Sequence, residues 1–311
     1  MNTKLDNCLF RFRPLDKTEE EDNRIITNLE REREYFSTPI HFNDPFDTLL
    51  YVDKNRLLGK IKQELDKGLD DLTNGIDDFV LRKLMEFEND ERNPNKNINR
   101  MLYYGNIIQS IPKVRAEFQK NIKEICFSSN IMSVLMWAHY ANDHKGFCIA
   151  YDINKLKERQ CFDHKGNSIE YKLRLKQVKY TNLRVDMTEY MYEYLPKYAF
   201  DVPTDVTKFM MEPPQKYLEE LILTKADIWK YEEEWRLYSI SETLLKPSII
   251  SYIQQKPKAI IVGTKTSLEN IKKLKIIADK KKIDILKMEA SDENIFKLNI
   301  TKINDYEKNR K

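Results

Sequence analysis

The chain has 311 residues, with 53 Lys and Arg against 50 Asp and Glu, and 41% of its residues are hydrophobic. This balance is typical of folded globular proteins, excludes intrinsic disorder and collagen-like repeats, and argues against a dedicated nucleic-acid coat protein. No run approaches the roughly 18 apolar residues of a membrane span, and no apolar segment follows a basic cluster at the start. We therefore expect a cytoplasmic protein without membrane contact. The four cysteines form no CxxC pair, which argues against structural zinc and a disulfide framework.

The first part of the chain is predicted to contain strands and then helices. Residues 8–13 alternate apolar and basic side chains, the period of a half-buried strand, which Pro14 ends. A second strand is expected over 35–37, stopped by Pro39. Helical spacing then covers 53–124, which predicts an insertion of three or four helices.

The middle of the chain is predicted to alternate between strands and helices. Strands are expected at 124–129 and 146–152, on either side of a helix that Ser133 caps. A further strand is expected over 172–181, and helices between 187 and 225.

The last part, 255–311, has a β-α-β pattern whose helix is expected to open with a capping box formed by Thr266 and Glu269. It carries 15 Lys and Arg against 8 Asp and Glu. This excess indicates either a solvated lysine-rich helix face or a patch that binds phosphate. Together the elements predict a single α+β domain over 1–311, with a mixed, twisted sheet as its core and 53–124 as a helical appendage.

Two carboxylates, Glu232 and Glu234, are the sharpest candidates for chemistry. Alternation over 230–240 predicts a strand that places both on one face, about 7 Å apart, where they would repel each other in a dry site. Such a pair needs cations nearby, and the candidates are Lys225, Arg236, Arg11 and Arg13. The alternative is a salt-bridged strand face in solvent, and the neighbouring Trp229 and Trp235 favour the site.

Other residue types give weaker signals. The four histidines show no metal-ligand spacing, and His139 is better explained as a helix-end or core residue. In the segment FNDPFD, Asn43, Asp44 and Asp47 either face a pocket or form a turn in which carboxylates cap backbone donors. No motif of serine hydrolases, papain-like proteases, kinases or P-loop proteins is present.

Several short motifs occur in a familiar order. They are LFRF near the start, YFSTPIHFNDPFD, CFSSNIMSVLMWAHYANDHKGFCIAYD, KADIWKYEEEWRL and KAIIVGTK. In this order the chain resembles the bacterial family called domain of unknown function 2971, from about Leu9 to Ile300. The family name implies no activity, and 53–124 matches none of its motifs.

A second resemblance is to ADP-ribosyltransferases, in the order of polar residues on strands: Arg11, then Ser37 and Thr38, then Glu234. It implies an NAD-dependent enzyme of bacterial defence or toxin type. Glu234 would bind a ribose hydroxyl and stabilise an oxocarbenium-like transition state, and Glu232 would orient or deprotonate the acceptor. Arg11 would hold phosphate or ribose oxygens. The other residues expected to bind NAD are Arg13, Tyr35, Ser37, Asn43, Asp44, Trp137, His139, Tyr140 and Arg236.

Under this resemblance the acceptor is nucleic acid or protein, and the basic C-terminal segment is its docking surface. Two alternatives stay open: a non-enzymatic sensor that binds a nucleotide or a partner in the same pocket, and a metal-dependent nuclease. Because exposed-site substitutions usually cost little stability, Glu234→Gln is expected to abolish activity while lowering the melting temperature by no more than about a degree or two.

Overall fold

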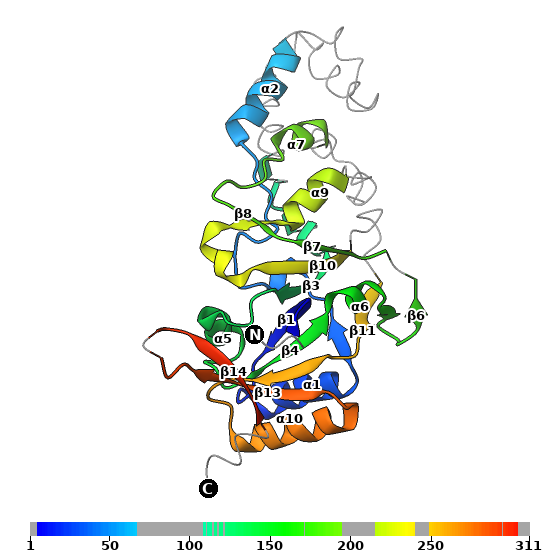
Figure 1. The fold of residues 1–311 in the computed structure, drawn as a ribbon. Helices are drawn as coiled ribbons and strands as arrows, with labels where there is room; N and C mark the ends of the chain where they lie inside the picture. The colour runs from blue at the N-terminus through cyan, green and yellow to red at the C-terminus, as the bar shows by residue number, and fades with distance from the viewer. Residues whose placement is uncertain are drawn as a thin grey trace.

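The structure is a computed structural model. It describes residues 5–66, 122–170, 172–194, 215–239, 249–293 and 295–303, with short helical pieces between 108 and 120. These residues form an α+β fold, as predicted, around an eight-stranded mixed sheet (Figure 1). Its order is β14-β13-β12-β4-β1-β3-β10-β7, and only β12 and β13 run parallel. In chain order its strands are β1 (Cys8–Arg13), β3 (Lys123–Ser128), β4 (Phe147–Asp152), β7 (Arg174–Gln177), β10 (Glu234–Ser239), β12 (Ala259–Val262), β13 (Asp284–Ala290) and β14 (Leu298–Lys302).

Two smaller sheets lie beside the large one. The four-stranded sheet has the order β2 (Arg33–Tyr35), β11 (Ile250–Gln254), β5 (Gln160–Asp163) and β6 (Ser168–Ile169), and the two-stranded sheet pairs β8 (Lys179–Thr181) with β9 (Thr224–Ala226). The strand predicted over 172–181 is present but divided at Val178: β7 pairs with β10, and β8 pairs with β9 instead.

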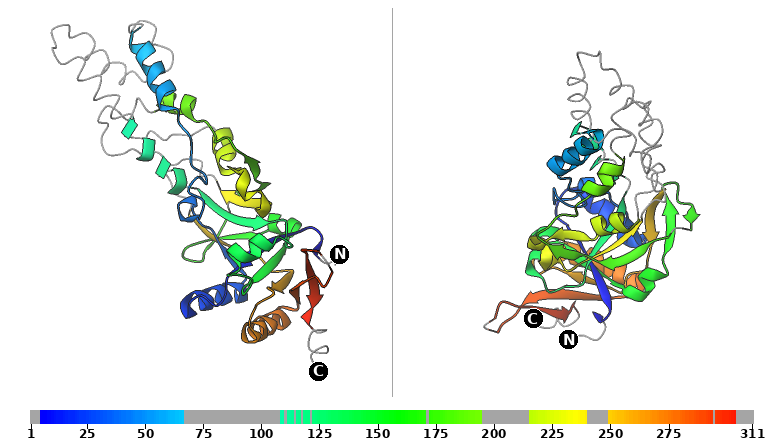
Figure 2. Two further views of the ribbon diagram at one scale, coloured as in Figure 1. Left: turned by 90° about the vertical axis from the view of Figure 1, so that its left-hand side faces the viewer. Right: turned by 90° about the horizontal axis from the view of Figure 1, so that it is seen from above.

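Helices cover both faces of the large sheet. On one face α1 (Glu19–Glu30) and α10 (Leu268–Lys281) pack their apolar side chains against the core, and Figure 2 shows the two helices close together. On the other face, α5 (Val134–Tyr140) buries Trp137, whose ring lies edge-on to that of Phe12 at 5.1 Å. Short α6 (Ile153–Lys157) follows β4 directly. None of the helices in the described part of the chain has the length and apolar character that crossing a membrane requires.

A group of helices extends from the opposite end of the molecule (Figure 2). It contains α2 (Lys54–Asp66), α7 (Thr188–Tyr194) and α9 (Gln215–Ile222), and α2 packs against α7. The predicted insertion over 53–124 thus begins with a helix and ends in helical pieces before β3, while 67–107 lies outside the described residues.

Local signals near helix ends are confirmed in part. Ser133 caps α5, because its side chain accepts a hydrogen bond from Met136 N. The β-α-β unit of the C-terminal segment is confirmed by the parallel pairing of β12 and β13. Its capping box is wrong: Ser267 accepts from Asn270 N, whereas the Thr266 hydroxyl donates to a carbonyl across the fold.

The strand predicted over 230–240 is also corrected. Residues 227–232 form the 3-10 turn η5 (Asp227–Glu232), Glu233 has a left-handed backbone with φ 44°, and β10 starts only at Glu234. Glu232 and Glu234 are therefore not neighbours on one strand, although both turn toward the same space. Another 3-10 turn, η2 (Pro39–His41), precedes the FNDPFD segment.

Two glycines allow close approach of segments beside β1. A Cβ atom on Gly146 would lie 2.1 Å from the carbonyl oxygen of Arg13, and one on Gly263 would lie 2.1 Å from that of His144. Since backbone cannot yield as a side chain can, both positions require glycine. The contact at Gly146 fixes the end of β1.

Candidate functional site

The large sheet opens between β1 and β3. Strand β1 pairs with β4 along its whole length but with β3 only at Phe10 and Ser128. Beyond that pair lies a cavity of about 460 Å³, lined by β1, β3, α5, η5 and the segment around Phe42 and Asn43. A break in strand pairing therefore creates room for a ligand within the sheet.

Most of the predicted site residues line this cavity. They come from segments far apart in the sequence and are Arg11, Arg13, Ser37, Asn43, His139, Tyr140, Glu232 and Glu234. Ser37 is held there by its backbone, which exchanges two hydrogen bonds of 2.9 Å with Glu124 at the start of β3. The fold thus gathers one polar cluster from β1, the segment that follows β2, α5, η5 and the start of β10.

Four predicted residues lie elsewhere. Tyr35 is 39% exposed on β2, outside the cavity. Asp44 is buried, and its Oδ1 accepts from Phe46 N at 2.9 Å, which is the turn interpretation of FNDPFD. Trp137 is a core residue whose indole N–H donates to the carbonyl of Ile131 at 2.8 Å. The fourth is Arg236.

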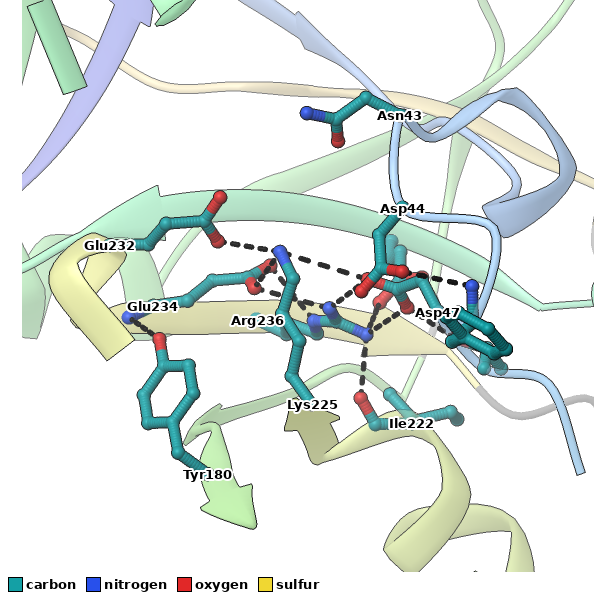
Figure 3. A network of polar contacts seen from close by, with 12 residues as sticks. Asn43, Asp44, Asp47, Tyr180, Ile222, Lys225, Glu232, Glu234 and Arg236 are labelled. Carbon is teal, nitrogen blue, oxygen red and sulfur yellow. Dashed lines mark hydrogen bonds and ion pairs between the residues drawn. The ribbon is translucent and has the colours of Figure 1, made fainter. Parts of the chain in front are cut away.

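Arg236 is fully buried behind the cavity and organises a network of carboxylates (Figure 3). Its Nη1 and Nη2 donate to the two oxygens of Asp47 at 2.9 and 2.6 Å, and its Nε donates to Glu234 Oε1 at 2.8 Å. Nη1 also donates to the carbonyl of Ile222 at 2.7 Å and lies 3.3 Å from Glu124 Oε2. A bidentate guanidinium is well suited to this task. Arg236 therefore fixes Glu234 and makes no contact with the cavity.

Lys225 on β9 bridges the two predicted carboxylates. Its Nζ donates to Glu232 Oε2 at 2.5 Å and to Glu234 Oε2 at 3.1 Å, while the ring of Trp229 lies 5.1 Å away. The predicted need for nearby cations is confirmed, and Lys225 and Arg236 supply them. The alternative of a solvent-facing strand is wrong, because Glu232 and Glu234 are only 3% and 4% exposed.

The carboxylates differ in acidity. Burial alone would raise the pKa of Glu234, but Arg236 and Lys225 lower it to about 2. Burial raises the pKa of Glu232, because Lys225 compensates only in part. The pKa of Glu124 is raised to about 8, first because the group is buried and also because Asp47 and Glu234 repel its charge. Because their acidities differ, Glu234 and Glu232 can take different roles, Glu234 as a fixed negative charge and Glu232 in proton transfer.

The opposite wall of the cavity carries positive charge. Glu34, which is buried on β2, accepts from Arg13 Nη2 through Oε2 and from the Tyr151 hydroxyl through Oε1 at 2.7 Å. Arg11 Nε lies 3.7 Å from the same Oε2, and Arg11 Nη1 donates to the carbonyl of Cys126. One carboxylate thus faces two guanidiniums, and this wall keeps a net positive charge suited to phosphate.

The mouth of the cavity is tied together by hydrogen bonds. The Tyr140 hydroxyl donates to Glu232 Oε1 at 2.5 Å and accepts from Asn43 Nδ2 at 3.2 Å. The His139 ring lies 6.0 Å from that of Tyr231. Within the described ranges, no group of three or more His, Cys, Asp or Glu is placed to hold a metal ion.

Sequence reasoning did not find Glu34 or Glu124. Both stand among residues that alternate as strands, where a lone carboxylate between inward-facing neighbours is the available signal. Each is buried because a guanidinium from another strand lies beside it, and no pattern within its own strand reveals that partner.

Part of this region matches a known family. The family model described as "Protein of unknown function (DUF2971)" matches residues 136–237. The matched segment runs from α5 to β10 and carries Tyr140, Lys225, Glu232 and Glu234 of the cavity. This match confirms the resemblance to the family over residues 136–237. Comparison with curated proteins and with solved structures found no match.

Proposed function

We propose that the cavity binds NAD and that the protein is an ADP-ribosyltransferase-like enzyme. The observation that supports this proposal is the convergence of Arg11, Ser37 and Glu234 on one cavity. These are the residues whose order resembles that of the transferases, and they come from three separate parts of the chain. A volume of about 460 Å³ lies within the range of pockets that bind small molecules and cofactors.

In this proposal each wall has its own task. Arg11 and Arg13 hold the pyrophosphate through charge-assisted hydrogen bonds, while Ser37 binds the nicotinamide amide. Glu234, ionised because of its low pKa, accepts from a ribose hydroxyl and stabilises positive charge as the nicotinamide–ribose bond breaks. Arg236 and Lys225 hold that carboxylate in place before any ligand arrives.

Glu232 is suited to the second half of the reaction. Its raised pKa makes it a better base than Glu234, and Tyr140 and Lys225 fix its two oxygens at the edge of the cavity. There it can take a proton from the acceptor as the new bond to the ribose forms.

A second candidate function is nucleotide binding without transfer. Glu234 Oε2 already accepts from Lys225 and Arg236, and its Oε1 accepts from Arg236. A carboxylate with this many protein donors also fits a rigid binding pocket. The same walls would then hold a nucleotide as a signal.

The test measures nicotinamide release and the thermal shift caused by NAD, with and without chelator. The variants are Glu234→Gln and Ser37→Ala, and the control is Lys272→Ala on the exposed side of α10. The small stability cost expected for Glu234→Gln from the sequence is revised, because this buried carboxylate holds two cations and its loss is expected to cost on the order of 3 kcal/mol. Assays are therefore run well below the melting temperature of that variant.

The transferase is supported if nicotinamide release falls in both site variants, is unchanged in the control and persists in the presence of chelator. A thermal shift by NAD without release assigns the cavity to binding alone. If NAD causes no thermal shift and no nicotinamide is released, both functions are contradicted. Nicotinamide release that chelator abolishes would favour metal-dependent chemistry. Ser37→Ala keeps the test decisive, since it leaves the buried ion pairs intact.

A further inference from the structure

A second cavity, of about 220 Å³, shares one lining residue, Lys225, with the first. Its walls are the turn after Asp44, the segment that follows β8, and the end of α9 with β9. The other lining residues are Phe46, Thr48, Leu49, Thr181, Asn182, Leu183, Arg184, Val185, Leu221, Thr224 and Ala226. None of the described lining residues is a carboxylate.

The second cavity carries positive charge that no acid neutralises within the described ranges. The charge of Lys225 is paired with those of Glu232 and Glu234. Among the described residues, Arg184 instead donates to backbone, through Nη2 to the carbonyls of Leu49 and Leu50 at 3.0 and 2.9 Å. Arg115 lies close enough for its charge to lower the pKa of Arg184, after the larger effect of burial.

Arg115 itself lacks a partner for a buried donor. Its Nε is buried and makes no hydrogen bond with the described part of the protein. A buried unsatisfied donor is costly, so a second acceptor is expected at this place. Two neighbouring guanidiniums with no carboxylate beside them among the residues that the structure describes are an arrangement suited to binding phosphate.

Exposed apolar groups adjoin these cations. The guanidinium of Arg184 lies 5.6 Å from the ring centroids of both Phe46 and Tyr51. Phe46 is 58% exposed and Leu183 is 79% exposed, although both line the cavity. A flat apolar surface beside a free cation matches the way proteins hold unpaired bases, by stacking the base and pairing its phosphate.

We propose that the second cavity binds one base of a single-stranded nucleic acid, with the adjacent phosphate at Arg184 and Arg115. At about 220 Å³ it is smaller than a typical cofactor pocket, so it fits one group that projects from a longer chain. An acidic peptide would use the guanidiniums but would leave Phe46 and Leu183 without a partner. This binding needs no NAD and stands apart from the proposed function.

The experiment measures fluorescence anisotropy of a short labelled single strand of mixed sequence, as DNA and as RNA, with the full chain at low salt. Arg184→Gln removes the charge and keeps an amide donor for the Leu49 and Leu50 carbonyls. Phe46→Leu keeps apolar bulk and removes the ring. Lys272→Ala is the matched control, because it removes one charge from the basic C-terminal segment, where the sequence placed nucleic-acid docking.

We expect each cavity variant to weaken binding roughly 5- to 100-fold, the range of one stacked base or one specific contact. Arg184→Gln is also expected to lower the salt dependence of binding by about one phosphate contact. Lys272→Ala is expected to change affinity less than about twofold.

The proposal is overturned if wild type does not bind the strand at low salt, or if Lys272→Ala weakens binding as much as Arg184→Gln. It is also overturned if Phe46→Leu binds as well as wild type, since no base would then lie at the ring. Competition by a glutamate-rich peptide at the same concentration as the strand would assign the site to acidic protein instead. Thermal melting of each variant verifies folding.

Discussion

The buried carboxyl of Glu124 makes the stability of the protein depend on pH. It is fully buried on β3, and neither of its oxygens makes a hydrogen bond within the described residues. Burial and the charges of Asp47 and Glu234 raise its pKa from 4.5 to about 8, although Arg236 opposes the rise. Between these two values the folded protein holds a proton that the unfolded chain releases.

The direction of the effect follows from this difference in bound protons. Because the folded state binds more protons than the unfolded state, the free energy of unfolding falls as pH rises from about 4.5 to about 8 and levels off above it. At about 1.4 kcal/mol per pH unit, the complete fall between pH 4.5 and about 8 is on the order of 5 kcal/mol. Glu124→Gln has nearly the shape of the protonated acid and cannot ionise, so it lacks this fall.

We expect Glu124→Gln to match wild type within about 1 kcal/mol at mildly acidic pH, since its amide replaces a neutral carboxyl of equal size. At mildly alkaline pH we expect it to be more stable than wild type by a few kcal/mol. Urea unfolding followed by tryptophan fluorescence at several pH values measures the difference. Glu232 also has a raised pKa, but it is present in both proteins and cancels in the comparison. Parallel pH dependence of the two proteins would refute the reasoning.

The remaining predictions concern packing and charge. Arg236→Met is expected to lower the free energy of unfolding by about 3–5 kcal/mol, because buried carboxylates lose their partner, and the loss should shrink on acidification as they gain protons. An equal loss at all pH values would contradict this account. Gly146→Ala is expected to cost about 1–3 kcal/mol, since its Cβ meets the Arg13 carbonyl at 2.1 Å. Gly59→Ala, in helix α2 with open space around it, is the control and should stabilise by about 0.5–1 kcal/mol in thermal or urea unfolding.

Local periodicity was sufficient to predict much of the framework. Residues 8–13 and 146–152 form strands because alternating or continuous apolar side chains fit a sheet with a core on each face. The C-terminal β-α-β unit was also predictable, since its helix and strands have distinct periods. These signals lie within single elements.

The candidate site was predictable in composition but not in geometry. Alternation around Glu232 and Glu234 suggested one strand, yet Glu233 adopts a left-handed backbone, and Lys225 brings the two carboxylates together across the turn. Arg236 belongs behind the cavity because Asp47, distant in sequence, supplies a bidentate partner. Such contacts depend on tertiary packing, which no local pattern encodes.

One residue, Lys225, is common to the linings of the two cavities. Its ammonium donates to Glu232 at 2.5 Å and to Glu234 at 3.1 Å, so it has little freedom to move without breaking one of these hydrogen bonds. If a ligand in one cavity changes this pairing and thereby the affinity of the other cavity, a ligand in the second cavity changes the affinity of the first by the same factor, by thermodynamic reciprocity. Lys225 is therefore the residue through which occupancy of one cavity can affect ligand binding in the other.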